Sequence, residues 1–241
     1  MEFKEGIYEN LDYPTYDSIP AWRSHDLTSI AKCPFTWKNR TFNNSPALFE
    51  GRVMHTVFLE HYKFAEEFAI EPPVDRRTKV GKAEYAEWLE ELGDKDPVKQ
   101  DLYDTCMERR EVVSDYIPKG KHHVELTLCW IWNGWDYKSC RDASPRGFRS
   151  AINTFRYHQQ AAYYLAGCRA VGLPTEKFYF LAQEKQAPYP FGVYTLSDEA
   201  IAYADAQNEQ AMAIGIKCRE QDLYLPYNQE GIKEFGLADL N

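Results

Sequence analysis

The stretch that decides the fold runs from Val124 to Tyr164 and reads VELTLCWIWNGWDYKSCRDASPRGFRSAINTFRYHQQAAYY. It opens with apolar residues at every second position, a pattern that predicts a β-strand. It then passes Asn133-Gly134, continues as a second extended segment, and enters a segment with helical spacing. Strand followed by helix within one stretch predicts a mixed α/β fold.

Two polar pairs in this stretch have the spacing of a shared face. Asp136 and Lys138 are two residues apart, and strand side chains repeat with a period of two. Gln160 and Tyr164 are four apart, which places them on one face of a helix. A metal-dependent phosphodiester-cleaving site needs such a set, because the carboxylate holds a cation and the lysine orients water and stabilises developing charge.

The dipeptide Asn133-Gly134 lies between the two extended segments and predicts a β-hairpin. In that register Glu125 lies six residues along the strand from the partner of Asp136, roughly 20 Å away. Two carboxylates that share one cation must both approach it to about 2.0–2.6 Å. A strict hairpin therefore does not let Glu125 join Asp136, which makes Glu125 the weaker candidate metal ligand.

Composition describes a packed globular chain. The protein has 241 residues, of which 44% are hydrophobic and 15% aromatic, enough for one domain with a full core. No apolar run is long enough to span a bilayer, so we expect a cytoplasmic protein with no membrane partner. The six cysteines contain no C-x-x-C pair, so neither zinc nor an iron–sulfur cluster is indicated.

The net charge of −9 argues against a protein that coats DNA with a broad basic surface. It leaves room for a site with local contacts, since metal sites concentrate carboxylates. Arg141, Arg146 and Arg149 follow the acid-x-Lys pair and could contact phosphates there. The alternative, ordinary solvated surface arginines, carries about equal weight.

The rest of the chain divides into an arm and one domain. Residues 1–23 show no period and are predicted to form an extended N-terminal arm, and residues 24–241 a single domain. Tyr85, Trp88, Leu89 and Leu92 are expected to pack inward. Helices are predicted over 26–33 (capped by Ser24, stopped by Pro34), 83–93, 96–116 and 198–218. Two further helices are opened by Ser45-Pro46 and by Ser144-Pro145, the second with Phe148, Ile152 and Phe155 facing the sheet. Residues 177–185 and 190–196 are predicted to form an antiparallel pair of strands.

One histidine has a position that chemistry could use. His55 follows Gly51 on the helix opened by Pro46, where both share a stripe with apolar residues. A lone histidine on an apolar helix face is more often a packed core residue than a metal ligand. From periodicity alone, a metal role for His55 is therefore the minority reading.

The motifs occur in a definite order, and the order resembles a known family. Gly51-x-x-x-His55, then Glu125, then Asp136-x-Lys138, then Tyr157-x-x-Gln160-Ala161-Ala162-x-Tyr164 is similar to the RecB-type branch of the PD-(D/E)xK nucleases. Within that branch the chain resembles the exodeoxyribonuclease VIII (RecE-type) family. The phrases PPVDRRTKVGKAEYAEWLEELG, KSCRDASPRGFRSAI and FLAQEKQAPYPFGVYTL also resemble it, so the likeness extends from about Ser24 to the C-terminus.

The resemblance implies a restriction-endonuclease-like fold, a mixed central sheet flanked by helices. It implies an exodeoxyribonuclease that uses Mg²⁺ or Mn²⁺ and acts on linear duplex DNA in phage-type recombination, in the cytoplasm of a bacterial host. The implied partners are double-stranded DNA ends, a single-strand annealing protein and further copies of the chain. The implied site has His55 and Asp136 as metal ligands, Lys138 at the attacking water, and Gln160 and Tyr164 as positioning groups, and we expect these five side chains to converge in one concave site.

The chain departs from the family pattern at one point. In the family, the first strand is followed by a second strand whose Asp, in an Arg-x-Asp context, shares the metal. Here Trp132-Asn133-Gly134-Trp135 runs directly into Asp136, so we expect the sheet to lack one core strand. Two readings stay open: a metal-dependent exonuclease, and a catalytically impaired descendant that binds DNA ends or a recombination partner. A third reading, an α/β domain with no nucleic acid role, requires the ordered motifs to be coincidental.

Overall fold

The computed structural model describes residues 15, 18–19, 21–41, 45–116, 134–173, 175–227 and 234. Within them the central sheet contains β3 (Trp135–Cys140), β4 (Tyr179–Glu184) and β5 (Phe191–Thr195), in the order β3-β4-β5. β3 runs parallel to β4, and β4 runs antiparallel to β5. The sheet is therefore mixed, as predicted, and the predicted pair of strands at 177–185 and 190–196 is confirmed. Residues 124–133 lie outside the described residues, and so do the predicted hairpin and the expected loss of a strand.

The glycine before β3 has a clear local role. Gly134 has a φ of 73°, and a side chain at this position would collide with the carbonyl of Lys177. The carbonyl of Gly134 accepts a hydrogen bond from the backbone N–H of Tyr179 at the start of β4. Glycine is needed here because the chain enters β3 in the left-handed region and against a neighbouring backbone.

Two helices connect β3 to β4. α8 (Pro145–Phe155) begins at the predicted cap, where Ser144 Oγ accepts from the backbone N–H of Gly147 at 3.1 Å. α9 (Tyr157–Ala170) follows after Arg156, whose φ is 57°. Phe148 is buried as predicted, but Phe155 is 63% exposed, so its predicted packing on the sheet is wrong. Phe155 is the last residue of α8, and its ring stacks on Tyr157 beyond the reversal at Arg156, with centroids 5.5 Å apart.

The opposite side of the sheet is covered by α4 (Pro46–Leu59) and α7 (Gln100–Val112). The elements between them include η1 (His61–Lys63), α5 (Phe64–Glu67), β1 (Phe68–Ile70) and β2 (Asp96–Val98), and η2 (Ser114–Tyr116) follows α7.

The helix predicted over 96–116 is wrong at its start. Asp96-Pro97 forms β2, which pairs in parallel with β1, and Val98 is fully buried. Burial of Val98 against β1 outweighs the helix-start signal, and α7 begins only after Lys99.

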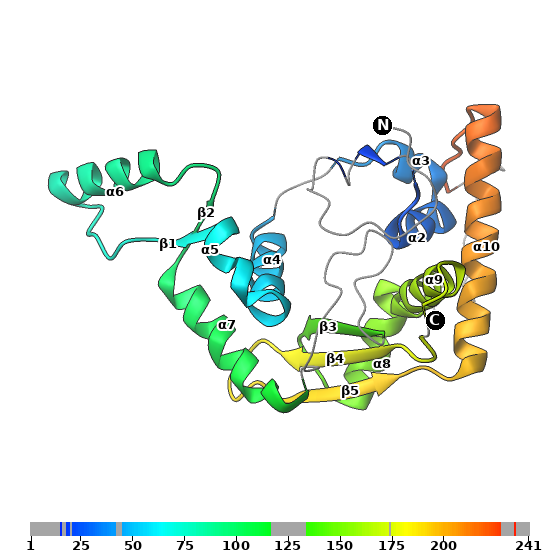
Figure 1. Ribbon diagram of the computed structural model, residues 1–241. Coiled ribbons are helices and arrows are strands. Elements are labelled where there is room, and N and C mark those ends of the chain that lie inside the picture. Colours follow the sequence, from blue (N-terminus) through cyan, green and yellow to red (C-terminus); the bar gives the residue numbers. More distant parts are fainter. Residues whose placement is uncertain are drawn as a thin grey trace.

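The helix predicted over 83–93 is present as α6 (Lys79–Glu91), with Thr78 as its cap and Gly93 at a φ of 64° after its end. Its predicted apolar stripe is not core. Leu89 is 43% exposed, and Tyr85 packs on Trp88, with ring centroids 5.4 Å apart, and donates its hydroxyl to Glu71. Figure 1 shows the reason, because α6 projects from the β1–β2 pair away from the rest of the molecule.

A third group of helices contains α2 (Ser24–Lys32), α3 (Pro34–Lys38) and α10 (Asp198–Gln221). Ser197 caps α10 as predicted, and α10 packs on α9 and α2 (Figure 1). One prediction about α2 is wrong: its N-cap is Arg23 and not Ser24, and the Arg23 N–H donates to Asp26 Oδ2. Its end is as predicted, since α2 ends at Lys32, directly before Cys33 and Pro34, and Pro34 then opens α3. Pro34 sits at the first position of α3, where a missing N–H costs no hydrogen bond.

The sheet lies between two apolar cores. The α9 core contains Phe148, Leu165, Phe178 and Phe180, and the α4 core contains Val53, Phe58, Phe68, Cys106 and Leu181. The five cysteines among the described residues are free thiols. None of the described helices is both long and apolar enough to cross a bilayer.

Candidate functional site

Strand β3 presents different chemistry on its two faces. Tyr137 lies against Phe58 of α4, with ring centroids 4.2 Å apart, and belongs to the α4 core. Lys138 lies over the ring of Tyr157 at the start of α9, with Nζ 4.5 Å from the centroid. Because side chains alternate along a strand, Asp136 and Lys138 share the face toward α9. The predicted shared face of the acid-x-Lys pair is therefore present.

Asp136 and Lys138 form a close ion pair that is partly shielded from water. Lys138 Nζ lies 2.8 Å from Asp136 Oδ2, and the two side chains are 17% and 21% exposed. The approach lacks hydrogen-bond geometry, so the buried Oδ2 atom has no hydrogen-bond partner. Buried polar atoms are nearly always hydrogen-bonded, so an unsatisfied carboxylate oxygen is a candidate ligand atom.

The lysine is held by its neighbours on the same face. Ala182 of β4 lies opposite Lys138 in the register, and its small side chain leaves room for the longer one. Tyr157 covers the ammonium from the helix side. Burial raises the pKa of Tyr157 to about 12, with a further contribution from the negative charge of Asp136. The Tyr157 hydroxyl therefore keeps its proton well above neutral pH.

Gln160 and Tyr164 lie on α9, one and two turns beyond Tyr157, and both are half-buried. The ring of Tyr164 stacks on Phe178, with centroids 6.1 Å apart, and packs at the edge of the α9 core. These contacts give the Tyr164 ring a structural role. α9 thus places Tyr157, Gln160 and Tyr164 on the side of the sheet to which Asp136 and Lys138 point.

His55 comes from the other side of the sheet. It is half-buried on α4, one turn before Phe58, which packs on the Tyr137 face. β3 and β5 are the two edge strands of the described sheet, so the shortest route between His55 and Asp136 passes around the β3 edge. A shared metal site for the two stays a prediction. Glu125 lies outside the described residues.

The donor chemistry of Asp136 fits a hard divalent cation, which prefers carboxylate oxygen. Its buried and unsatisfied Oδ2 is the observation that supports the fit. Among the residues that the structure describes, no group of three or more His, Cys, Asp or Glu is arranged to hold a metal ion. Asp136 is therefore the one ligand that the geometry supports, and His55 and Glu125 remain the candidates for the others.

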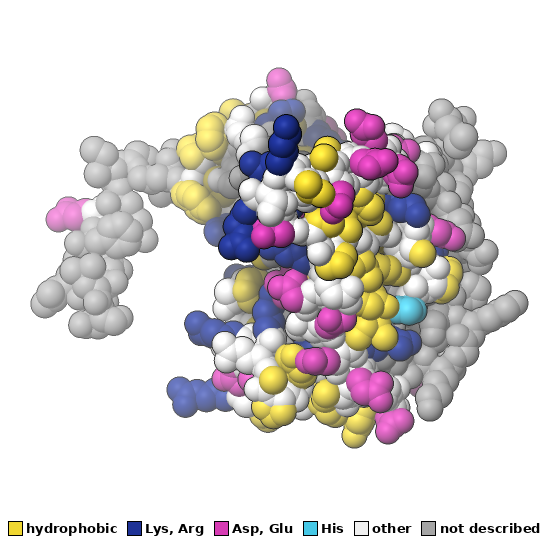
Figure 2. Space-filling view, turned by 90° about the vertical axis from the view of Figure 1, so that its left-hand side faces the viewer, with side chains coloured by type: hydrophobic (Ala, Val, Ile, Leu, Met, Phe, Trp, Pro, Cys, Tyr) yellow, Lys and Arg dark blue, Asp and Glu magenta, His cyan; other side chains and the backbone are white. Residues whose placement is uncertain are grey.

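The three predicted arginines are exposed side chains around the start of α8. Asp142 lies among them, and its pKa is lowered first by hydrogen bonds from Ser144 and then by the charges of Arg141 and Arg146. Asp142 thus offsets part of the positive charge near Arg141 and Arg146. In the face shown in Figure 2, Lys and Arg side chains gather in a band along one border, while Asp and Glu are scattered over the rest. Positive charge on that face is thus local.

Sequence reasoning missed the buried network behind β3. Arg109 of α7 is 1% exposed, and its Nη2 donates to the Tyr137 hydroxyl at 2.7 Å. That hydroxyl donates to Gln183 Oε1 at 2.9 Å, and Gln183 Nε2 donates to the Arg109 carbonyl at 3.0 Å. The signal was present, since Arg109 lies on the stripe of Leu102, Cys106 and Val113 at helical spacing.

A groove of about 540 Å³ lies among α2, the α8–α9 junction and α10. None of the five residues expected to converge lines this groove. The unsatisfied Asp136 oxygen, and not the groove, marks the candidate reaction site, because phosphodiester chemistry needs ligand and charge groups.

Comparison with known proteins identifies the family. Residues 26–226 match the PDDEXK-like domain of unknown function, DUF3799, and the chain belongs to this family. The family lies within the predicted PD-(D/E)xK superfamily, while the narrower RecE-type resemblance stays a prediction. A crystal structure from Eubacterium rectale, named "Putative exonuclease", is similar over 97% of this chain and 98% of that chain, with a TM-score of 0.57 and 15% identity. At that identity the likeness concerns the restriction-endonuclease-like fold. No curated protein matched the chain.

Proposed function

We propose that this protein is an exodeoxyribonuclease that uses Mg²⁺ or Mn²⁺ and degrades linear duplex DNA in phage-type recombination. The observation that carries the proposal is the Asp136–Lys138 pair on β3, with its buried carboxylate oxygen lacking a hydrogen-bond partner. Membership of a PDDEXK-like family supports a metal-dependent nuclease, since such enzymes generally use divalent metals. The name of the Eubacterium rectale protein supports the exonuclease assignment.

The chain's residues have separable roles in this proposal. Asp136 would hold the cation through Oδ2, with His55 or Glu125 as further ligands. The bound cation would supply an activated water and neutralise charge on the phosphate. Lys138 has three N–H donors, and Asp136 is the one carboxylate among the described residues within ion-pair distance of it. Its remaining donors can orient the attacking water or contact a non-bridging phosphate oxygen.

The residues of α9 would fix the geometry around this pair. Tyr157 covers the Lys138 ammonium and limits its rotamers. Gln160 can orient water or a phosphate through its side-chain amide, and the hydroxyl of Tyr164 can do the same while its ring stays packed on Phe178. Placement matters because an error of about 1 Å can reduce the rate by about 10²-fold.

A second function is favoured by one observation. In the sequence, Trp132-Asn133-Gly134-Trp135 runs directly into Asp136 without the Arg-x-Asp segment of the family pattern, as expected of a descendant that binds DNA ends or a recombination partner without cutting. Removal of one ligand from a two-carboxylate site weakens cation binding and misplaces the water.

Digestion of linear duplex DNA by the purified chain tests the two functions. With Mg²⁺ or Mn²⁺ present, we expect loss of linear duplex, survival of closed circular duplex, and complete inhibition by EDTA. Lys138→Ala should reduce the rate by about 10²–10³-fold, because it removes a charge aimed at the phosphate. The matched control is Lys95→Ala on an exposed lysine after α6. Binding of duplex ends without cleavage by the unmodified chain would favour the second function.

The proposed partners are tested separately. A single-strand annealing protein and further copies of the chain would assemble with it on DNA ends. Size-exclusion chromatography with light scattering, with and without blunt duplex, reports self-association. A strictly monomeric protein in both conditions would contradict the homo-oligomer.

A further inference from the structure

We propose that the groove among α2, the α8–α9 junction and α10 binds a single strand of DNA beside the Asp136–Lys138 pair. This inference rests on the proposed function, because it names the path of one substrate strand. The groove has a volume of about 540 Å³, and three helical segments far apart in sequence contribute its walls.

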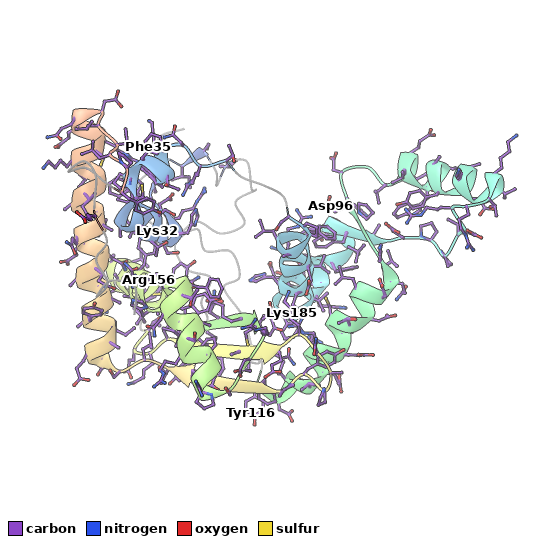
Figure 3. All side chains as sticks on the ribbon, turned by 180° about the vertical axis from the view of Figure 1, so that it is seen from behind. Lys32, Phe35, Asp96, Tyr116, Arg156 and Lys185 are labelled. Atoms are coloured by element: carbon purple, nitrogen blue, oxygen red, sulfur yellow. The ribbon has the colours of Figure 1, made fainter. Side chains whose placement is uncertain are left out.

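The groove carries positive charge. Lys32 at the end of α2 and Arg156 between α8 and α9 both line the groove, and both side chains are exposed. Figure 3 shows them on neighbouring elements beside α10. Of the described residues that line the groove, none is Asp or Glu, although the chain carries 37 acidic residues and 28 basic ones. In a protein with net charge −9, a concave surface with two cations and no carboxylate in its lining suits a polyanion.

The groove also contains an exposed aromatic ring. Phe155 lines the groove and is 63% exposed, so its ring is accessible from the groove. Bases of a single strand stack on such rings with little sequence preference, whereas bases inside a duplex are not available. Phosphate contacts from Lys32 and Arg156 combined with a ring for base stacking therefore favour a single strand.

Two stacked rings link the groove to the candidate reaction site. The ring of Phe155 stacks on Tyr157, with centroids 5.5 Å apart and an angle of 26°. The same Tyr157 ring lies 4.5 Å from Lys138 Nζ. One ring therefore separates the groove from the lysine of the candidate site. A strand stacked on Phe155 would extend past Tyr157 toward Asp136.

Neutral polar groups complete the lining. The hydroxyls of Thr28 and Ser29 donate to the carbonyl of His25, so they present acceptor lone pairs to the groove. Gln210 and Thr154 add an exposed amide and an exposed hydroxyl. Such groups can bind sugar and base edges but do not require one sequence. We therefore expect sequence-tolerant binding.

The test measures binding without cleavage. Fluorescein-labelled oligothymidylate of about 12 nucleotides, within the usual range of single-strand site sizes, is titrated with the full chain in EDTA and followed by anisotropy. The test variant is Lys32→Gln with Arg156→Asn, since asparagine tolerates the positive φ of Arg156. The control is Lys95→Gln with Lys217→Gln, which removes the same charge from exposed sites outside the groove.

We expect the test variant to bind at least tenfold more weakly than the control. A plot of log affinity against log salt concentration should be less steep for the test variant by about 1.4, the value for two lost single-strand phosphate contacts. Phe155→Leu should weaken binding about tenfold, while an abasic strand of the same length should bind wild type and Phe155→Leu equally. Equal affinity of the test and control variants, or an unchanged affinity of Phe155→Leu, would overturn the proposal.

These outcomes separate the groove from the nuclease. If the chain binds the oligonucleotide through Lys32, Arg156 and Phe155 but never degrades duplex, the groove stands and the proposed nuclease fails. If the chain degrades duplex but the groove variants bind the oligonucleotide as the control does, the groove fails and the nuclease stands.

Discussion

The two faces of β3 treat their polar groups in opposite ways. On the α4 side the Tyr137 hydroxyl both accepts from Arg109 and donates to Gln183. On the α9 side, one residue earlier, the buried Oδ2 of Asp136 has an ion-pair neighbour but no hydrogen-bond partner. A satisfied network stabilises a strand, whereas a carboxylate oxygen that meets only an ammonium keeps lone pairs that a cation can use.

The contrast is not complete, because Arg109 Nε is also buried without a hydrogen-bond partner. Its guanidinium is nevertheless held by the Tyr137 hydroxyl, and Glu50 lies 3.8 Å away. Glu50 in turn contacts Lys185 at 3.0 Å, which leads the network toward solvent. The α4 side therefore connects α4, α7 and both parallel strands, while on the α9 side Asp136 and Lys138 pair with each other.

The largest effect is expected from Asp136→Asn. It keeps the shape of the side chain but removes the charge of the proposed ligand atom, so metal-dependent DNA degradation should fall by about 10²–10³-fold. Initial rates on linear duplex measure this. Tyr137→Phe, the next residue, is the control: it should lower unfolding free energy by about 1–3 kcal/mol, because two buried partners lose a hydrogen bond, with little change in rate. Equal rate losses in both variants would remove the distinction between the faces.

The next effect concerns the buried arginine. Arg109→Leu should lower the unfolding free energy by about 1–3 kcal/mol, since it removes the buried donor to the Tyr137 hydroxyl. Urea denaturation followed by tryptophan fluorescence measures the change. Arg169→Leu, which breaks the exposed pair with Asp205, should cost less than about 1 kcal/mol. If the two variants are equally stable, the network behind β3 is not a structural anchor.

Alkaline pH probes Tyr157 on the α9 side. Burial raises the pKa of Tyr157 to about 12, above the value of about 10 in the unfolded chain. The folded state keeps this proton to higher pH, so its stabilising effect is present below about pH 10 and is lost as pH rises toward 12. Over that interval the wild-type protein should lose at most about 2 kcal/mol of unfolding free energy through Tyr157, a value already reduced for the partial exposure of the ring. Tyr157→Phe should not show this loss.

Denaturation of wild type and Tyr157→Phe at several pH values checks this difference. Burial raises the pKa of Tyr137 as well, so Tyr137→Phe should flatten the same interval from the other face. Identical pH curves for wild type and both variants would contradict the raised pKa values.

The smallest effect is expected where the network reaches solvent. Lys185→Gln removes the ion pair with Glu50, in which both side chains are more than 30% exposed. Its cost in unfolding free energy should be below about 1 kcal/mol and should shrink as salt is added. Denaturation at low and high salt measures this. A cost as large as that of Arg109→Leu would show that Glu50 and Lys185 belong to the buried anchor.

Local patterns determined much of this protein from sequence alone. The caps at Ser45, Ser144 and Ser197 predicted three helix starts, because a hydroxyl that accepts from a backbone N–H acts within four residues. The period of two predicted that Asp136 and Lys138 share a face. The ordered motifs predicted the PD-(D/E)xK superfamily, because their order along the chain is itself a property of the sequence.

Only the tertiary structure decided how these elements are used. The stripe of Tyr85, Trp88 and Leu89 is present on α6, yet α6 projects from the molecule and Leu89 is exposed. Pairing with β1 turned Asp96–Val98 into a strand, and Phe155, the last residue of α8, lines a groove instead of packing on the sheet. Burial depends on which surfaces meet, and partners far apart in the chain, such as Lys32 with Arg156 or Arg109 with Tyr137, are joined only by folding.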